Sequence, residues 1–154
     1  MKRMLVLTLA TWAMHAGAAV PYDDKMIVAI AKRTHSTRVE VVESLENGCA
    51  SGITPSMREC AEYHAVAADI ELNTVYQKLL GKLQGTHGKE RLPKAQRAWR
   101  AFRDANCAFE ASSWEGGTGH GITLSACETR MTQHRTKELE NYVRCDDAGC
   151  PGSD

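Results

Sequence analysis

Cysteine is the residue type with the clearest chemistry in this sequence. Six cysteines occur, an even number, and their spacing includes no C-x-x-C and fits no zinc finger. A disulfide framework is therefore favoured over a metal site, although sequence alone leaves the connectivity open. Pairing each cysteine with its neighbour closes local loops, and this predicts the bonds Cys49–Cys60, Cys107–Cys127 and Cys145–Cys150.

No other group of residues predicts catalysis. Glu62 and His64 stand too close on a helix to share a face, so they do not form the metal pair of an H-E-x-x-H helix. No serine lies in a nucleophile-elbow motif. The adjacent Asp146 and Asp147 do not resemble two carboxylates that face each other across a glycosidase cleft. We therefore expect a non-enzymatic protein without a cofactor or a metal.

The first 19 residues have the pattern of a secretory signal peptide. Lys2 and Arg3 precede an apolar stretch, Met4–Ala13, which is too short to span a bilayer. Small residues follow, and cleavage is predicted near Ala18 or Ala19. The alternative is a short N-terminal anchor that is never cut. Cleavage predicts a periplasmic or secreted protein with no membrane span in the mature chain.

The charge balance argues against two classes of partner. The whole chain carries 19 basic and 19 acidic residues, and loss of Lys2 and Arg3 leaves 17 against 19, a net charge near −2. Such a neutral chain does not favour nucleic acid or an anionic membrane surface. A protein partner remains, with the oligomeric state open.

The elements that must position these residues are helices. Residues 20–48 are predicted to form an arm of two short helices, with Ile27, Ile30 and Ala31 on one apolar face and Val39, Val42 and Leu45 on the other. The arm is either a recognition unit or a packing element, and packing is the preferred interpretation.

Two longer helices are predicted to form an antiparallel hairpin. The first covers residues 54–84, where apolar residues recur at three- and four-residue spacing. The second runs from Leu92 to Ala111 after a short glycine-containing loop. Its predicted buried stripe consists of Leu92, Ala95, Trp99, Phe102 and Phe109. Arg100 and Asp104 are spaced to pair on its surface.

A glycine-rich segment, residues 112–122, separates this hairpin from a third helix. Its glycines oppose regular structure, and it lacks the G-x-x-x-x-G-K-[ST] pattern of a phosphate loop. The third helix is expected to start near Thr123 or Ser125, since Ser125 and Glu128 have capping-box spacing. Residues 146–154 are expected to form a loose polar tail.

The second helix carries the residues that suggest a family. The stretch from Ala95 to Cys107, A-Q-R-A-W-R-A-F-R-D-A-N-C, resembles the A-Q-R-A-W-x-x-F-R-D-A-x-C signature of the LprI N-terminal family of lysozyme inhibitors, which includes YecT-like exported proteins. The segment from Cys60 to Tyr76 looks like the opening helix of that family, and Gly116-Gly117-Thr118 stands where the family has G-G-S. The resemblance covers about residues 55–143, and the expected family domain spans residues 49–145.

The resemblance implies an all-α, disulfide-stapled helical hairpin with a third helix and a protein partner. We interpret the signature mainly as scaffold. Trp99 and Phe102 are expected in the core, and Arg103 and Asp104 are expected to hold the loop junction. Polar contacts across the hairpin are expected from Asn73, Tyr76 and Gln96.

Two functions follow as hypotheses. The family suggests an inhibitor of lysozyme-type cell-wall hydrolases, in which a pre-ordered glycine-rich loop plugs the acidic active-site groove. The contact residues would then be Trp114, Glu115, Gly116, Gly117, Thr118 and His120. The alternative is a periplasmic structural or interaction module that binds another envelope protein, and the 20–48 arm favours this class.

Overall fold

The computed structural model describes residues 20–146 and 149–152, and all regular secondary structure in these residues is helical. The predicted signal peptide and its cleavage site lie outside the described residues. The helices are α1 (Asp24–Thr34), α2 (Arg38–Asn47), α3 (Thr54–Lys82), α4 (Gly88–Ala111) and α5 (His120–Arg144), with short 3-10 turns at Gly48–Ala50 and Ser112–Trp114. The predicted all-α class is confirmed. None of the described helices is both long and apolar enough to cross a membrane.

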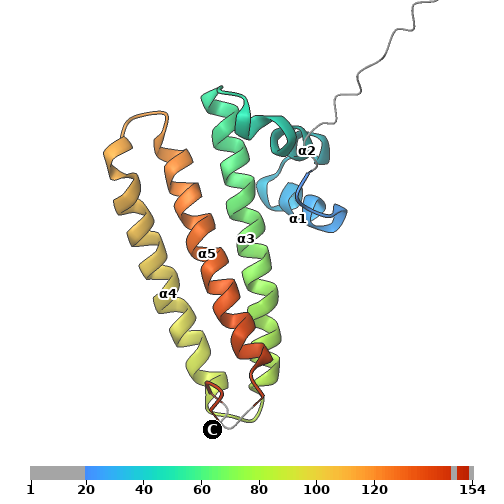
Figure 1. Ribbon diagram of the computed structural model, residues 1–154, viewed down its shortest axis with the longest axis vertical. Helices are drawn as coiled ribbons and strands as arrows, with labels where there is room; N and C mark the ends of the chain where they lie inside the picture. Colours follow the sequence, from blue (N-terminus) through green and yellow to red (C-terminus); the bar gives the residue numbers. More distant parts are fainter. Residues whose placement is uncertain (1–19, 147–148, 153–154) are drawn as a thin grey trace, which may run out of the picture.

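The three long helices stand in a row, with α5 between α3 and α4 (Figure 1). The α3–α5 contact is the most extensive helix pair, and α4 packs mainly against α5. The arm formed by α1 and α2 lies on α3, near the end where α3 begins. Helices α3 and α5 therefore form the central helix pair, and α4 packs on the other side of α5.

Two hydrophobic clusters hold this arrangement together. The first joins the arm to the first half of α3, where Ile30, Val41 and Tyr63 are almost fully buried. The second joins the end of α3 to α4 and α5 around Leu79 and Leu139. The packing interpretation of the arm thus has a physical basis, because its apolar side chains complete the first cluster. Val39, however, was expected in the core and is 64% exposed, because Val41, Ser44 and Leu45 form the inward face of α2.

The buried stripe predicted for α4 is partly wrong. Phe102 and Phe109 are 61% and 76% exposed, and Ala95 is exposed as well. Leu92 is buried as predicted, and the other buried positions of α4 are Gly88, Gln96, Cys107 and Ala111. The reason is that α4 packs mainly against α5, so its inward face follows α5 and includes polar side chains that a hydrophobicity pattern does not select.

The starts of α4 and α5 both precede their predicted positions. Helix α4 begins at Gly88, ahead of Leu92, and α5 begins at His120, ahead of Thr123. Ser125 therefore lies inside α5 and is not its cap. Gly121 explains why a glycine stands in a helix here: a Cβ at this position would lie 3.0 Å from Cδ of Arg58 on α3. The glycine thus leaves room for the Arg58 side chain beside α5, although the sequence pattern assigns this residue to a loop.

All three predicted disulfides are confirmed. Cys49–Cys60 joins the turn after α2 to α3, Cys107–Cys127 joins α4 to α5, and Cys145–Cys150 closes a small loop after α5. Their Cα atoms lie 5.4, 5.5 and 5.6 Å apart, which is the normal range for the bond. No described cysteine is free.

The C-terminal segment is more ordered than expected over residues 149–152. Cys150 is buried, and Gly152 packs so closely on Gly88 that a Cβ at Gly88 would lie 2.4 Å from the carbonyl oxygen of Gly152. Lys82 of α3 donates hydrogen bonds to the carbonyl oxygens of Val143 and Cys145 at the end of α5. Lys82 thus caps the C-terminal end of α5 and anchors the segment that follows it.

A local cap holds the start of α2, and its loss should be measurable. The Thr37 hydroxyl accepts a hydrogen bond from the backbone N–H of Glu40, and the Glu40 carboxylate accepts one from the backbone N–H of Thr37. This capping box also lowers the pKa of Glu40. We expect Thr37→Ala to reduce the free energy of unfolding by about 1 kcal/mol, measured by urea denaturation. The exposed Val39→Ala is the matched control, and an equal loss in both variants would contradict the cap.

Candidate protein-binding site

The α4–α5 connection is a short, hydrogen-bonded turn. Backbone bonds close it at three points: Glu115 N–H to Ser112 O (3.1 Å), Gly117 N–H to Trp114 O (2.9 Å) and His120 N–H to Gly117 O (3.4 Å). Gly116 has a φ of +74°, a conformation that favours glycine. The loop is therefore ordered by its own backbone, as a pre-formed binding surface requires.

Trp114 is the largest side chain of this loop. Its indole ring lies against Gly119, where a Cβ would meet Cε3 of the ring at 2.9 Å. Yet the residue is 54% exposed. One face of the ring is thus supported by the loop and the rest is available to solvent. An anchored, half-exposed tryptophan offers a large contact area with little conformational freedom to lose on binding.

The stem beneath the loop is braced covalently and by polar contacts. The Cys107–Cys127 bond is buried and crosses from α4 to α5. Beside this bond, Arg130 of α5 pairs with Glu110 of α4 at 2.6 Å, and Asn106 donates a hydrogen bond to the same carboxyl group at 2.9 Å. The Arg130 and Asn106 hydrogen bonds hold the pKa of Glu110 below its usual value. The two helices therefore present the loop from a fixed stem.

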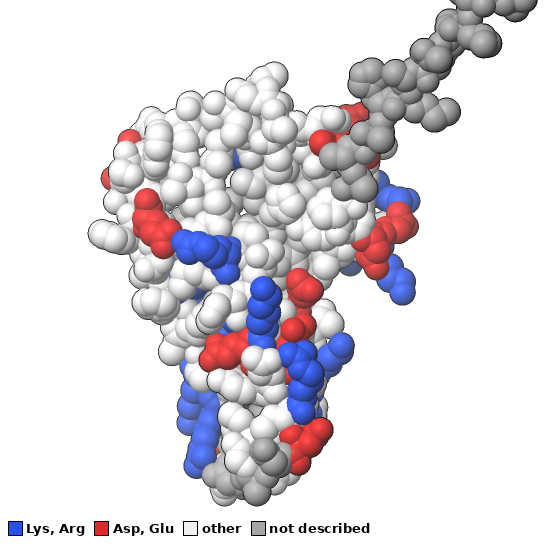
Figure 2. Space-filling model, in the orientation of Figure 1, with Lys and Arg blue, Asp and Glu red and all other residues white. Residues whose placement is uncertain are grey.

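The six predicted contact residues lie together at this end of the molecule. Trp114, Glu115, Gly116, Gly117 and Thr118 are exposed, whereas His120 is half-buried as the first residue of α5. In the view of Figure 2, the end that carries the loop is mostly free of charged side chains, which gather over the middle and the opposite end. On the face seen in this view, the tip is therefore largely uncharged, and the exposed Trp114 adds an aromatic side chain to the loop.

The residues of the family signature on α4 lie away from the loop, and several of them link α4 to its neighbouring helices. Gln96 of α4 is buried and accepts a hydrogen bond from Nε of Arg135 at 3.1 Å. Arg135 also pairs with Glu138 at 2.7 Å. The Trp99 ring has Arg103 at 5.4 Å and Arg135 at 6.0 Å from its centroid, so both guanidinium groups are within cation–π range.

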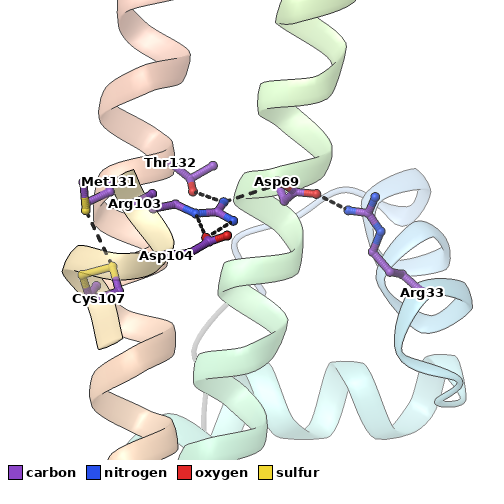
Figure 3. Close-up of polar contacts among 8 residues, drawn as sticks. Arg33, Asp69, Arg103, Asp104, Cys107, Met131 and Thr132 are labelled. Atoms are coloured by element: carbon purple, nitrogen blue, oxygen red, sulfur yellow. Dashed lines mark hydrogen bonds and ion pairs between the residues drawn. A yellow bond between two sulfur atoms is a disulfide. The ribbon is translucent and has the colours of Figure 1, made fainter. Parts of the chain in front are cut away.

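Arg103 is the second centre of this network (Figure 3). It binds Asp104 at 2.8 Å and Thr132 of α5 at 3.1 Å, and it lies 3.8 Å from Asp69 of α3. Asp69 also pairs with Arg33 of α1 at 2.7 Å. The predicted Arg100–Asp104 pair is therefore replaced by Arg103–Asp104. Arg103 connects α4, α5, α3 and, through Asp69, the arm.

An open groove of about 430 Å³ lies beside this network, lined in part by Arg33, Asp69, Arg103 and Glu128. Burial raises the pKa of Glu128, with Asp104 and Asp69 adding to the effect and Arg103 opposing it. The groove has mixed charge, and two of its arginines, Arg33 and Arg103, already pair with Asp69. Its lining favours a structural role over a ligand site.

One cluster of the described residues has metal-ligand types at close range. Ligand atoms of Cys49, Cys60 and His64 lie within 4.8 Å of one another. The two sulfur atoms are joined in a disulfide, so neither can act as a thiolate ligand. The Nδ1 atom of His64 is 2.6 Å from the hydroxyl of Tyr22 in a half-buried contact between the arm and α3, and burial lowers the pKa of His64.

A family model for the lysozyme inhibitor LprI matches residues 47–139. The chain belongs to the LprI family. An uncharacterized protein of Rhizobium meliloti is 33% identical over 96 residues, which cover 54% of this chain and 69% of that relative. No solved structure matches the chain.

The LprI region includes the whole of α3, α4 and the loop, and most of α5. LprI is an inhibitor family, which is consistent with a protein that acts by binding, and the three disulfides fit an extracytoplasmic location. Within this LprI-family chain, Gln96, Trp99 and the Arg103–Asp104 pair make contacts inside the helical domain. Arg103 binds Thr132 of α5 and lies near Asp69 of α3, not at the loop junction where it was expected. A core or scaffold role does not suit Phe102 or Asn73, which are both exposed. Tyr76 is half-buried and packs against the second hydrophobic cluster.

Sequence analysis assigned no role to the residues that α5 contributes to this network. Arg135 and Thr132 are buried, and Glu138 and Tyr142 extend the same set of hydrogen bonds. A signal was present: Thr132, Arg135 and Leu139 recur at three- and four-residue spacing on α5. A periodicity search that is limited to apolar residues does not detect this stripe, because two of its three members are polar.

Proposed function

We propose that this protein is an exported, non-catalytic binding protein whose α4–α5 loop inhibits a lysozyme-type cell-wall hydrolase. One observation carries the proposal: Trp114 stands half-exposed on a loop that is closed by backbone hydrogen bonds and stapled at its stem by Cys107–Cys127. Membership of the LprI family supports a lysozyme as the partner. The three disulfides, together with the signal-like N-terminus, support a periplasmic or secreted location.

The proposed mechanism is steric occlusion. A lysozyme active site is a groove that contains catalytic carboxylates. The loop is narrow, because it connects two adjacent helices through only five residues after the 3-10 turn. Trp114 would supply the apolar anchor, while exposed backbone groups at Gly116 and Gly117 and the Thr118 hydroxyl would bind polar groups of the groove. Because the loop is already ordered, it loses little entropy on binding.

Trp114 provides the sharpest test. We expect Trp114→Ala to weaken inhibition of lysozyme-driven cell-wall lysis by at least about 30-fold, the loss typical of a central aromatic contact. The assay is a dose–inhibition curve with oxidised protein purified from a bacterial periplasm. Val39→Ala, a change at an exposed apolar residue of α2, is the matched control and should inhibit like the wild type.

Two results would overturn this proposal. Wild-type protein that is folded by circular dichroism but does not slow lysis would exclude this hydrolase as the target. Full inhibition by Trp114→Ala would exclude the loop as the contact. In the first case, the better interpretation is a structural or interaction module. The arm favours this interpretation, because α1 and most of α2 precede the region that matches the LprI family. Deleting residues 20–48 would then be expected to abolish capture of the envelope partner.

A further inference from the structure

Helix α4 presents a second unusual surface, on the side away from α5. Between residues 95 and 109 this side carries only alanine and phenylalanine, all of them exposed. We define the outer α4 face as Ala95, Ala98, Ala101, Phe102, Ala105, Ala108 and Phe109. Phe102 and Phe109 are two of the six large hydrophobic residues exposed in the described chain, at 61% and 76%.

The outer α4 face lies opposite the buried face of the same helix. Gln96, Arg103 and Cys107 point toward α5, which is the neighbour along most of α4. At 100° per residue, the centre of the outer face lies roughly 160° from this inward face. Figure 1 shows α4 at the edge of the row, with no helix on its outer side. A helix that is apolar on its solvent side has a face that fits a partner.

The spacing on this face is that of a coiled-coil seam. Ala95, Ala98, Phe102, Ala105 and Phe109 follow a strict alternation of three and four residues, as the a and d positions of a heptad do. Such a seam matches another helix that runs nearly parallel or antiparallel to it. The flanking Ala101 and Ala108 are small, so two helix backbones could approach closely.

We propose that the outer α4 face binds the same face of a second copy of this protein, with the two α4 helices antiparallel. In that orientation a single register places Phe102 against Ala105 of the second copy and Phe109 against its Ala98. Each large side chain thus meets a small one, twice over by symmetry. Parallel pairing would instead place phenylalanine on phenylalanine and alanine on alanine, which leaves gaps between the alanines.

Charges at the ends of the seam favour the same orientation. Lys94 lies just before the seam, and Glu115 lies just after α4 and its 3-10 turn. Antiparallel pairing brings Lys94 of one copy beside Glu115 of the other at both ends. Parallel pairing would set Lys94 near the second Lys94, where like charges repel.

The available area suits a weak dimer. A buried aromatic side chain contributes roughly 200 Å². With the exposed fractions of Phe102 and Phe109 and the five exposed alanines, two copies would bury on the order of 1,000 Å², the low end of specific interfaces. We therefore expect a concentration-dependent dimer with a dissociation constant of roughly 10–100 μM.

Sedimentation velocity of the oxidised, periplasmically expressed protein tests the dimer. The wild type should shift from monomer to dimer across this range, and Phe102→Lys should weaken dimerisation by at least about 30-fold. Val39→Lys is the matched control, because Val39 is equally exposed but lies on α2. Phe102 is exposed, so the variant should keep its helical circular dichroism. A wild type that stays monomeric throughout, or a Phe102→Lys variant that dimerises like the wild type, would overturn the proposal.

Two further measurements test the antiparallel orientation of the dimer and whether dimerisation is independent of the proposed inhibitor function, on which this inference does not rest. A spin label at Glu90→Cys, a site with no free cysteine nearby, should give an axial separation of about 40 Å in the antiparallel dimer and only about 10 Å in a parallel one. A short distance would contradict the register. Phe102→Lys should inhibit the hydrolase as the wild type does, because the loop does not use Phe102. A monomeric wild type whose inhibition is lost in Phe102→Lys would instead assign this face to the hydrolase.

Discussion

Replacing both Cys107 and Cys127 with serine should lower the free energy of unfolding by about 3 kcal/mol and remove most of the inhibitory activity. The two cysteines are separated by 20 residues, and the bond closes the segment that contains the whole α4–α5 loop. Without it the unfolded chain gains entropy. The loop would also rely on the exposed Glu110–Arg130 pair to hold its stem, and exposed pairs contribute little.

A second double variant separates loop order from general stability. Replacing Cys145 and Cys150 with serine opens a bond with a sequence separation of 5, at the other end of the molecule. It should cost about 2 kcal/mol on the same entropic argument and leave inhibition intact below the melting transition. Thermal denaturation and lysis assays at a temperature where both variants are folded give the comparison. Equal inhibition by the two variants would show that the staple does not organise the binding surface.

The other large effect is expected at Arg135. Its side chain is only 10% exposed, and it binds Gln96, Glu138 and the Trp99 ring. Arg135→Ala would leave the buried Gln96 oxygen without this donor and would open space beside Trp99. We expect a loss of about 3 kcal/mol, because removing one partner from a buried polar network costs more than the network contributes. Urea denaturation measures this loss, with Arg130→Ala as the surface control, expected to cost below about 1 kcal/mol.

The Arg135 contact should also be visible in the dependence of stability on pH. Desolvation raises the pKa of Glu138, but hydrogen bonds from Arg135 and Tyr142 outweigh it, so the pKa is lowered in the folded protein. A lowered carboxyl pKa contributes stability above the unfolded value of about 4.3 and loses it as the pH falls through the folded value. The difference between the wild type and Arg135→Ala should therefore shrink in acid. A constant difference from neutral pH into acid would argue against an ionic contribution of this pair.

Much of the fold could be predicted because local signals agreed with the tertiary arrangement. The long apolar repeat of α3, Pro55 in its first turn and the short loop that includes Gly85 all predict a helical hairpin. The disulfides were predictable for the same reason, since each joins cysteines that are near in sequence. The α4–α5 loop could be singled out by its glycines, which the Gly116 turn and the Trp114–Gly119 contact require.

The error on α4 has a physical cause. A pattern of apolar residues was assigned to the core of α4, but this helix packs mainly against α5 and fills its inward face with Gln96, Arg103 and Cys107. Phe102 and Phe109 are therefore exposed on the other side. Their outward position depends on which helices pack around α4, and a single sequence does not specify which helices those are. The polar partners on α5, such as Arg135, were missed because charged residues are normally assigned to the surface.

All three disulfides join cysteines that are consecutive along the chain, and this matters for how the protein is made. As the chain emerges into an oxidising compartment, each second cysteine meets an unpaired partner and no other, because earlier cysteines have already been joined. Sequential oxidation in order of synthesis thus produces the native set directly. Maturation should need a thiol oxidase but no disulfide isomerase, so the yield of active protein should be insensitive to loss of the isomerase in the producing cell.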